Sequence, residues 1–149
     1  MTLFVLDTDI LSLFQEGHEA VCRRICAQAL GELATTVITV EEQLSGWYTL
    51  VRRAKGPGRL ALAYQRLADN VAFLAHCRIL SFTEDAIAGY EHLKSLKLGT
   101  KKMDLRIAAI TLEHGGTLVT RNVRDFQCIP GLVIENWAAE GDQGSLVNH

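Results

Sequence analysis

The chain has 149 residues, of which 48% are hydrophobic and 21% are charged, and its formal net charge at pH 7 is -2. This length suffices for one domain with a proper core and excludes two domains of ordinary size. The small net charge excludes a strong overall attraction to a polyanion, so nucleic-acid binding would depend on local basic clusters. Because neither a basic leader with an apolar stretch nor a run of about 18 apolar residues occurs, we expect a cytoplasmic location.

The first predicted elements lie within the first 40 residues. An apolar run over residues 3–6 predicts a strand, and Thr8 and Asp9, which follow it, are residue types that begin helices. Apolar residues at helical spacing predict a helix over 19–33, and β-branched residues predict a strand over 35–38. The chain therefore opens with a strand, a helical segment and a second strand.

A helical hairpin is predicted next. Thr39, with Glu42 three residues later, matches a capping box and predicts the start of an amphipathic helix that ends near Lys55. Glycine and proline at 56–58 break the chain, and helical spacing resumes over 60–76. We expect the two helices to pack side by side.

The second half of the chain repeats the alternation of strand and helix. Short runs of apolar and β-branched residues predict strands at 78–82, 117–120 and 132–134. One helix is predicted to begin after Thr83 and to end by Gly99. Another begins at Asp104 and ends at Gly115.

This alternation predicts an α/β fold. Strands that alternate with helices form a mostly parallel sheet, here of four to five short strands, with helices on both faces and ligands beyond the carboxyl ends of the strands. We expect one domain over residues 1–138. The polar, glycine-rich remainder, 139–149, is expected to be a flexible tail.

Four acidic residues stand at predicted element ends beside apolar runs: Asp7, Glu42, Asp104 and Asp125. Asp7 and Asp125 follow strands, and Glu42 and Asp104 lie in the first turns of helices. The predicted topology allows these positions to meet at one edge of the sheet. Carboxylates gathered there raise one another's pKa unless a cation neutralises them, so the pattern predicts a Mg²⁺ or Mn²⁺ site with hydrolytic chemistry.

Each acid also has a structural explanation. Asp7 and Asp9 could cap the first helix, and Glu42 could serve only the capping box. Asp104 could be an N-cap, and Asp125 could be a turn residue. The residues alone leave these alternatives open.

Three segments carry a family resemblance: FVLDTDIL over 4–11, TVEEQLSG over 39–46, and DLRIAAITLEHGGTLVTRNVRDFQCIPGLVIENW over 104–137. On these motifs the chain resembles PIN-domain proteins, specifically VapC-type ribonuclease toxins of type II toxin–antitoxin pairs. The resemblance spans nearly the whole chain. The last segment is the most specific, because its acid, IAA helix, LVTRN strand, RDF turn and NW ending follow the order found in the family.

The resemblance implies a Mg²⁺- or Mn²⁺-dependent endoribonuclease. Its catalytic and metal-binding acids correspond here to Asp7, Glu42 and Asp104, with Asp104 as the candidate general base. The fourth position falls on either Asn122 or Asp125, because some relatives carry an aspartate where this chain has Asn122. The implied reaction is in-line attack of water on a phosphodiester.

Neighbouring residues have supporting roles in this interpretation. Thr8 and Thr120 are expected to donate hydrogen bonds that orient the carboxylates. Five basic residues near the same crevice could hold RNA phosphates, or could form only a solvated rim: Arg121, Arg124, Lys101, Lys102 and Arg106.

The resemblance also implies partners. Toxins of this family are usually homodimers, and the C-terminal segment of a small antitoxin fills the catalytic groove and often places a cation among the acids. Trp47, Tyr48 and Tyr64 on the predicted hairpin could face the antitoxin, or could belong to an ordinary core.

Two rival functions fit the same residues. A structure-specific DNA nuclease of the flap type would use the same acids on a different polymer. A catalytically inactive PIN-like scaffold would keep the fold and lose the activity, and Asn122 in place of an acid favours that alternative.

Overall fold

The computed structural model describes residues 2–139 and 146–147, whose strands form one six-stranded sheet in the order β3-β2-β1-β4-β5-β6. The strands are β1 (Phe4–Leu6), β2 (Leu33–Thr36), β3 (Ile79–Leu80), β4 (Thr117–Val119), β5 (Val133–Glu135) and β6 (Leu146–Val147). All neighbouring pairs are parallel except β5 with β6. The prediction of a mostly parallel sheet is confirmed. Most of the predicted tail lies outside the described residues, and its described part is Ala139 and the edge strand β6.

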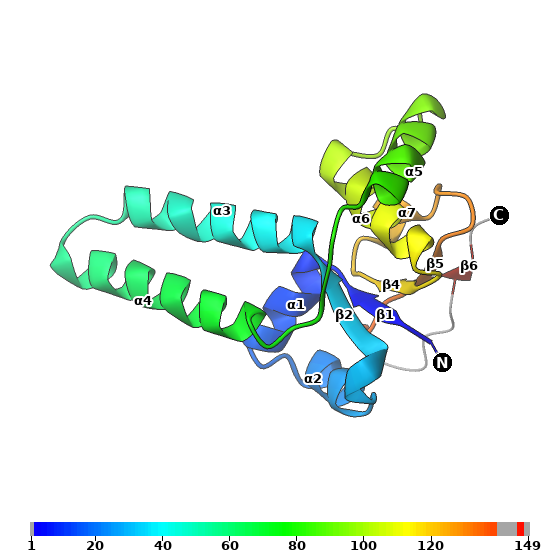
Figure 1. Cartoon of the computed structure of the whole chain (residues 1–149). Coiled ribbons are helices and arrows are strands. Elements are labelled where there is room, and N and C mark those ends of the chain that lie inside the picture. Colours follow the sequence, from blue (N-terminus) through cyan, green and yellow to red (C-terminus); the bar gives the residue numbers. More distant parts are fainter. Residues whose placement is uncertain (1, 140–145, 148–149) are drawn as a thin grey trace.

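Helices cover both faces of this sheet, as predicted (Figure 1). They are α1 (Thr8–Gln15), α2 (Glu19–Cys26), α3 (Val37–Arg53), α4 (Pro57–Leu74), α5 (Glu84–Ser95), α6 (Lys102–Glu113) and α7 (Val123–Phe126), with a 3-10 turn, η1 (Leu30–Glu32). Among the described residues, no helix has both the length and the apolar character needed to cross a membrane.

Neighbouring residues of the short strands supply two hydrophobic clusters. Val5 and Leu118 pack in one cluster with Ile110 of α6, whereas Leu6 and Val119 pack in the other with residues of α1 and α2. Successive side chains of a strand point to opposite faces of a sheet. A strand of three apolar residues therefore serves both layers, which explains the continuous apolar runs in the sequence.

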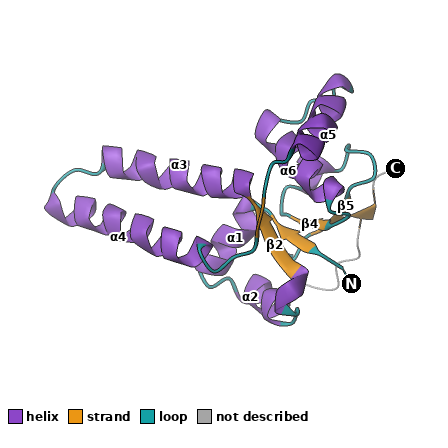
Figure 2. Cartoon of the chain, viewed as in Figure 1, coloured by secondary structure: helices purple, strands orange, loops and turns teal. Residues whose placement is uncertain are grey.

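The helices α3 and α4 form the predicted hairpin, which extends away from the sheet (Figures 1 and 2). We call it the α3–α4 arm. Its turn is sharp because Gly56 has a φ of 83°, a conformation that glycine adopts at little cost. Pro57 then occupies the first turn of α4, where its fixed φ suits a helix start.

The start of α3 differs from the prediction and changes the interpretation of Glu42. The strand β2 ends at Thr36, and the Thr36 hydroxyl accepts a hydrogen bond from the Thr39 amide at 3.1 Å. Thr36 is therefore the N-cap, and the predicted capping box at Thr39 is wrong. Glu42 lies beyond the first turn of the helix, so its carboxylate is not occupied by capping.

Other boundaries also differ from the predictions; for example, α6 begins at Lys102 and not at Asp104. The helix predicted over 19–33 ends at Cys26, with Ala27 as its C-cap, and η1 follows it over Leu30–Glu32. The RDF segment, predicted as a turn, is the short helix α7. The last predicted strand begins one residue later, at Val133.

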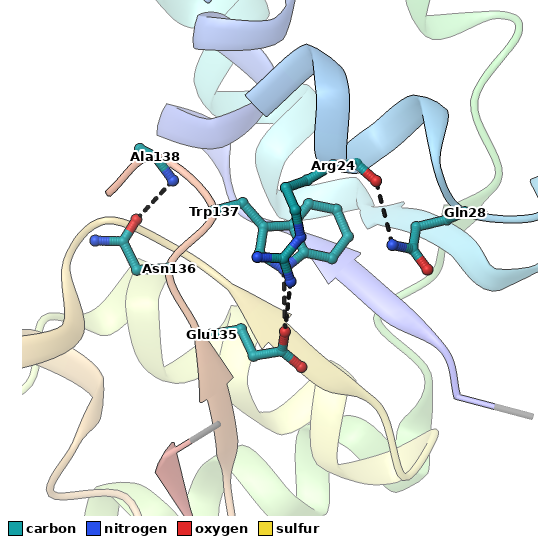
Figure 3. A network of polar contacts seen from close by, with 6 residues as sticks. All are labelled: Arg24, Gln28, Glu135, Asn136, Trp137 and Ala138. Atoms are coloured by element: carbon teal, nitrogen blue, oxygen red, sulfur yellow. Dashed lines mark hydrogen bonds and ion pairs between the residues drawn. The ribbon is translucent and has the colours of Figure 1, made fainter. Parts of the chain in front are cut away.

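The end of β5 is fixed to α2 by a small network of contacts (Figure 3). Glu135 accepts hydrogen bonds from the Arg24 guanidinium at 3.2 Å and from the indole N–H of Trp137 at 3.1 Å. The Arg24 guanidinium also lies over the Trp137 ring, which is 1% exposed and packs against Phe4. These contacts hold the segment that follows β5 against α2.

Candidate active site

Asp7 lies at the carboxyl end of β1, where both oxygens of its side chain are fixed. Its Oδ1 accepts a hydrogen bond from the Thr8 amide at 2.8 Å, and its Oδ2 accepts one from the Thr120 hydroxyl at 2.7 Å. Thr120 follows β4, the neighbouring strand, so two adjacent strands position one carboxylate. Thr120 was expected to orient an acid, and its hydroxyl lies on Asp7.

The surroundings of Asp7 oppose its ionisation. Its side chain is 4% exposed. Burial, followed by the nearby charge of Asp9, raises the pKa of Asp7 to about 7, although the hydrogen bonds from Thr120 and Thr8 act in the opposite direction. A carboxylate held in this way is half ionised near neutral pH unless a cation compensates its charge.

Asp9 belongs to the same cluster, which the sequence interpretation underestimated. One oxygen of its carboxylate accepts a hydrogen bond from the Arg121 amide at 3.2 Å, and the other, Oδ1, is buried without a hydrogen-bond partner in the described part of the chain. Burial raises its pKa. One feature of the sequence could have identified Asp9 as a site residue: it lies two residues after Asp7, so both acids stand at the start of the same helix.

Thr8 connects the end of the first strand to α3. Its hydroxyl donates a hydrogen bond to Glu42 Oε1 at 2.8 Å and lies 3.0 Å from the Thr39 hydroxyl. Glu42 is half-buried, so this contact holds a carboxylate from the arm beside the acids of the sheet. Thr8 is thus a donor to Glu42 by its side chain and to Asp7 by its backbone.

Asp104 completes the group from the first turn of α6. Burial, followed by the charges of Glu42 and Asp125, raises the pKa of Asp104 to about 6, and Lys101 opposes this effect. The charges that act on Asp104 thus come from three other helices: Asp9 of α1, Glu42 of α3 and Asp125 of α7. Its N-cap is Lys101, so Asp104 is not the cap that one alternative required.

The fourth acidic position remains a prediction. Asn122, the N-cap of α7, and Asp125, within α7, are both exposed. The backbone N–H of Asn122 donates a hydrogen bond to the Thr120 hydroxyl at 3.0 Å, and the same hydroxyl holds Asp7. Asp125 acts on the pKa of Asp104. Asn122 therefore borders the Asp7 side of the site and Asp125 the Asp104 side.

The donor set suits a hard divalent cation that keeps part of its water shell. In residues 2–139 and 146–147, no three Asp, Glu, His or Cys side chains are close enough together to bind one ion directly. Mg²⁺ commonly uses one or two carboxylates together with waters and substrate phosphates, so a closed ligand cage is not required. The unpartnered oxygen of Asp9 and the raised pKa values of Asp7 and Asp104 fit such a cation.

The five basic residues predicted to hold RNA phosphates differ in their exposure and contacts. Four of them are exposed around the acids: Lys101, Lys102, Arg121 and Arg124. Arg106 instead stacks its guanidinium on the rings of Phe82 and Tyr90, at 5.5 and 5.3 Å from their centroids.

A groove of about 680 Å³ opens beside Thr8 and Glu42, between α1, α3 and α4. Trp47 lines it, together with the buried amides of Gln43 and Asn70. The two tyrosines predicted to face a partner, Tyr48 and Tyr64, are 45% and 54% exposed on the arm.

Comparisons with known proteins give a consistent result. A family model described as the PIN domain matches residues 4–131. The plasmid stability protein StbB of Pseudomonas syringae pv. tomato is 31% identical over 143 residues, which cover 92% of this chain and 100% of that protein. Ribonuclease VapC2 of Rickettsia felis is 35% identical over 71 residues, 44% of this chain, so the match spans only 52% of that relative.

Among solved structures, a toxin–antitoxin complex from Klebsiella pneumoniae contains a chain of similar fold. The TM-score is 0.65 and the sequence identity is 25%, with 87% of this chain and 94% of that chain covered.

Proposed function

The chain belongs to the PIN domain family, and we propose that it is a Mg²⁺- or Mn²⁺-dependent endoribonuclease, the toxic component of a type II toxin–antitoxin pair acting in the cytoplasm. One arrangement carries this proposal: Thr8 holds Asp7 at the end of β1 through its amide and Glu42 of α3 through its hydroxyl, and Asp104, in the first turn of α6, adds its charge to the buried Asp7. The names of VapC2 and of the toxin–antitoxin complex support the choice of RNA as substrate and of an antitoxin as partner.

The chain's own residues would bind and orient the reacting groups. Asp7, Glu42 and Asp104 would hold the cation, in part through waters that it keeps, while Thr8 and Thr120 keep two of these carboxylates in place. The bound cation would supply Lewis acidity to the phosphate and lower the pKa of the attacking water.

Asp104 would accept the proton of that water at a carboxylate oxygen. Its pKa of about 6 is near the working pH, which suits a general base. The water oxygen bonds to phosphorus, and the bond to the departing 3′ oxygen breaks. Asp125 or Asn122 would complete the site from α7.

The groove beside Glu42 would receive the antitoxin. It brings the half-buried Trp47 next to the acids, so one peptide segment could fill the groove and place a cation among them. In this proposal, bound antitoxin and productive RNA binding exclude each other, and the toxin forms a homodimer within a larger complex.

Cleavage of RNA by the purified chain tests the proposal. With Mg²⁺ or Mn²⁺ present, the wild-type chain should cut single-stranded RNA, and Asp7→Asn and Asp104→Asn should abolish cutting. Asp85→Asn, an exposed acid of α5, is the matched control and should cut normally. Equal cutting by Asp7→Asn, or preference for a DNA of the same sequence, would contradict the proposed function.

A further inference from the structure

Positive charge is concentrated on the α3–α4 arm. Between Glu42 and Asp69 the chain has no acidic residue and five basic ones, which are Arg52, Arg53, Lys55, Arg59 and Arg66. Residues 43–68 therefore carry a formal charge of +5, and because the whole chain carries -2, the remainder carries -7. The positive segment is the outer part of the arm, which extends away from the sheet (Figure 1), whereas the arm's own three acids, Glu41, Glu42 and Asp69, lie in the first part of α3 and the last part of α4.

These five cations have no counter-ion within the described residues. All five side chains are exposed, and none of them takes part in the ion pairs or hydrogen bonds of that part of the chain. Like charges so close along two packed helices repel one another and cost stability. A cluster of this kind needs a polyanion or solvent to compensate it.

The shape of the arm adds a second feature. A groove of about 430 Å³ lies between α3 and α4 and is lined by four of the cations together with Trp47 and Leu50. Trp47, Leu50 and Arg66 also line the groove that reaches Thr8 and Glu42. The two grooves therefore adjoin at these residues, and the axial rise along α3 from Glu42 to Arg53 is about 16 Å.

We propose that the α3–α4 arm binds single-stranded RNA, with its cations on the phosphates and Trp47 stacking on a base, and guides the strand to the acids. Single-stranded nucleic acids are bound in general by a basic groove that contains an aromatic platform. The inference rests on the proposed function, because it takes RNA as the polymer. An acidic protein segment is the competing occupant, but it has no bases to stack on Trp47.

Salt-dependent binding tests the arm directly. The probe is a fluorescein-labelled, unstructured RNA of 20 nucleotides, measured by anisotropy with Asp7→Asn protein so that the probe stays intact. The quadruple change R53Q/K55Q/R59Q/R66Q, which removes the four cations that line the groove, should weaken binding about tenfold or more and lower the slope of log K against log salt by about 2 to 3. Because these side chains are exposed, the variant should keep the thermal stability of its parent.

The matched control removes the same charge elsewhere. R23Q/R78Q/K94Q/K97Q changes four exposed cations outside the arm and should bind the probe as its parent does. Trp47→Leu should weaken binding and leave the salt slope unchanged, because stacking releases no counterions. Equal loss in the two quadruple variants would overturn the proposal. The proposal would also be overturned if the arm variant bound RNA normally and lost only its binding to the protein encoded beside the toxin.

Cleavage by the wild-type chain is scored separately. Arm-dependent RNA binding without any RNA cleavage would refute the proposed function and leave the arm assignment standing. RNA cleavage together with RNA binding that does not depend on the arm would support the proposed function and refute the arm assignment.

Discussion

The sheet and the α3–α4 arm are built on opposite principles. Val5, Leu118 and Ile134 of the sheet have no exposed side-chain surface, and helices cover them on both faces. On the arm, Leu62 and Tyr64 are 55% and 54% exposed, and only one face of each helix packs against its neighbour. The difference teaches that stability resides in the sheet and its covering helices, while the arm is free to serve recognition.

The acids lie at the junction of these two regions. Asp7 belongs to the sheet and Glu42 to the arm, and Thr8 donates hydrogen bonds to both. A movement of the arm relative to the sheet would therefore change the spacing of the acids. The following substitutions and conditions test how different the two regions are.

The largest effect is expected at Trp137 in the sheet region. Trp137→Ala removes a ring that is 1% exposed and that contacts Phe4, Arg24 and Glu135. The free energy of unfolding should fall by about 3–5 kcal/mol, measured by urea denaturation. Trp137→Phe should lose less because most of the ring packing survives. A loss below about 1 kcal/mol for the alanine variant would contradict the assigned role of this cluster.

A smaller effect is expected from pH in protein freed of divalent cations. The pKa of Asp7 rises from 3.8 in the unfolded chain to about 7 in the fold, so the folded state binds the extra proton between these values. The free energy of unfolding should therefore fall as the pH rises from about 4 to 7 and should stay level above pH 7. The contribution of Asp7 to this fall is at most about 4 kcal/mol. Raised pKa values at Asp9 and Asp104 act in the same direction.

Thermal denaturation in EDTA across this pH range measures the effect. Asp7→Asn should flatten much of the slope, and Asp85→Asn should leave it unchanged. Stability that rises between pH 5 and 7 would show that burial does not oppose ionisation of Asp7.

The arm should give the smallest effect. Tyr64→Ala removes a side chain that is 54% exposed, so the free energy of unfolding should change by about 0.5 kcal/mol or less in the same urea experiment. A loss of several kcal/mol would mean that this surface is covered, for example by a second copy of the chain, and would remove the contrast between arm and sheet.

The order of elements was predictable because local patterns control it. Apolar runs bounded by Asp7 and by Gly115 marked strand and helix ends correctly, and the break at 56–58 marked the hairpin. The start of α3 was not predictable from local pattern. Two threonines, Thr36 and Thr39, both suit an N-cap, and the parallel pairing of β2 with β1 decides between them.

For the candidate site, the sequence identified the acids more readily than their contacts. Asp7, Glu42 and Asp104 were singled out by their positions at element ends, and Thr120 by the family resemblance. For Asp9 the sequence offered only a possible cap of the first helix, because a capping aspartate and a buried site aspartate look the same in sequence. Its buried, unpartnered oxygen depends on Arg121, a residue 112 positions away, and only the folded chain brings them together.

Mn²⁺ binding followed by electron paramagnetic resonance at pH 8 tests the central claim most directly, because this pH lies above the pKa of both Asp7 and Asp104. The account predicts that the wild-type chain and Asp85→Asn bind Mn²⁺ alike, while Asp7→Asn and Asp104→Asn bind it about tenfold more weakly or worse. Equal Mn²⁺ binding by all four proteins would contradict the claim that these acids form one cation site.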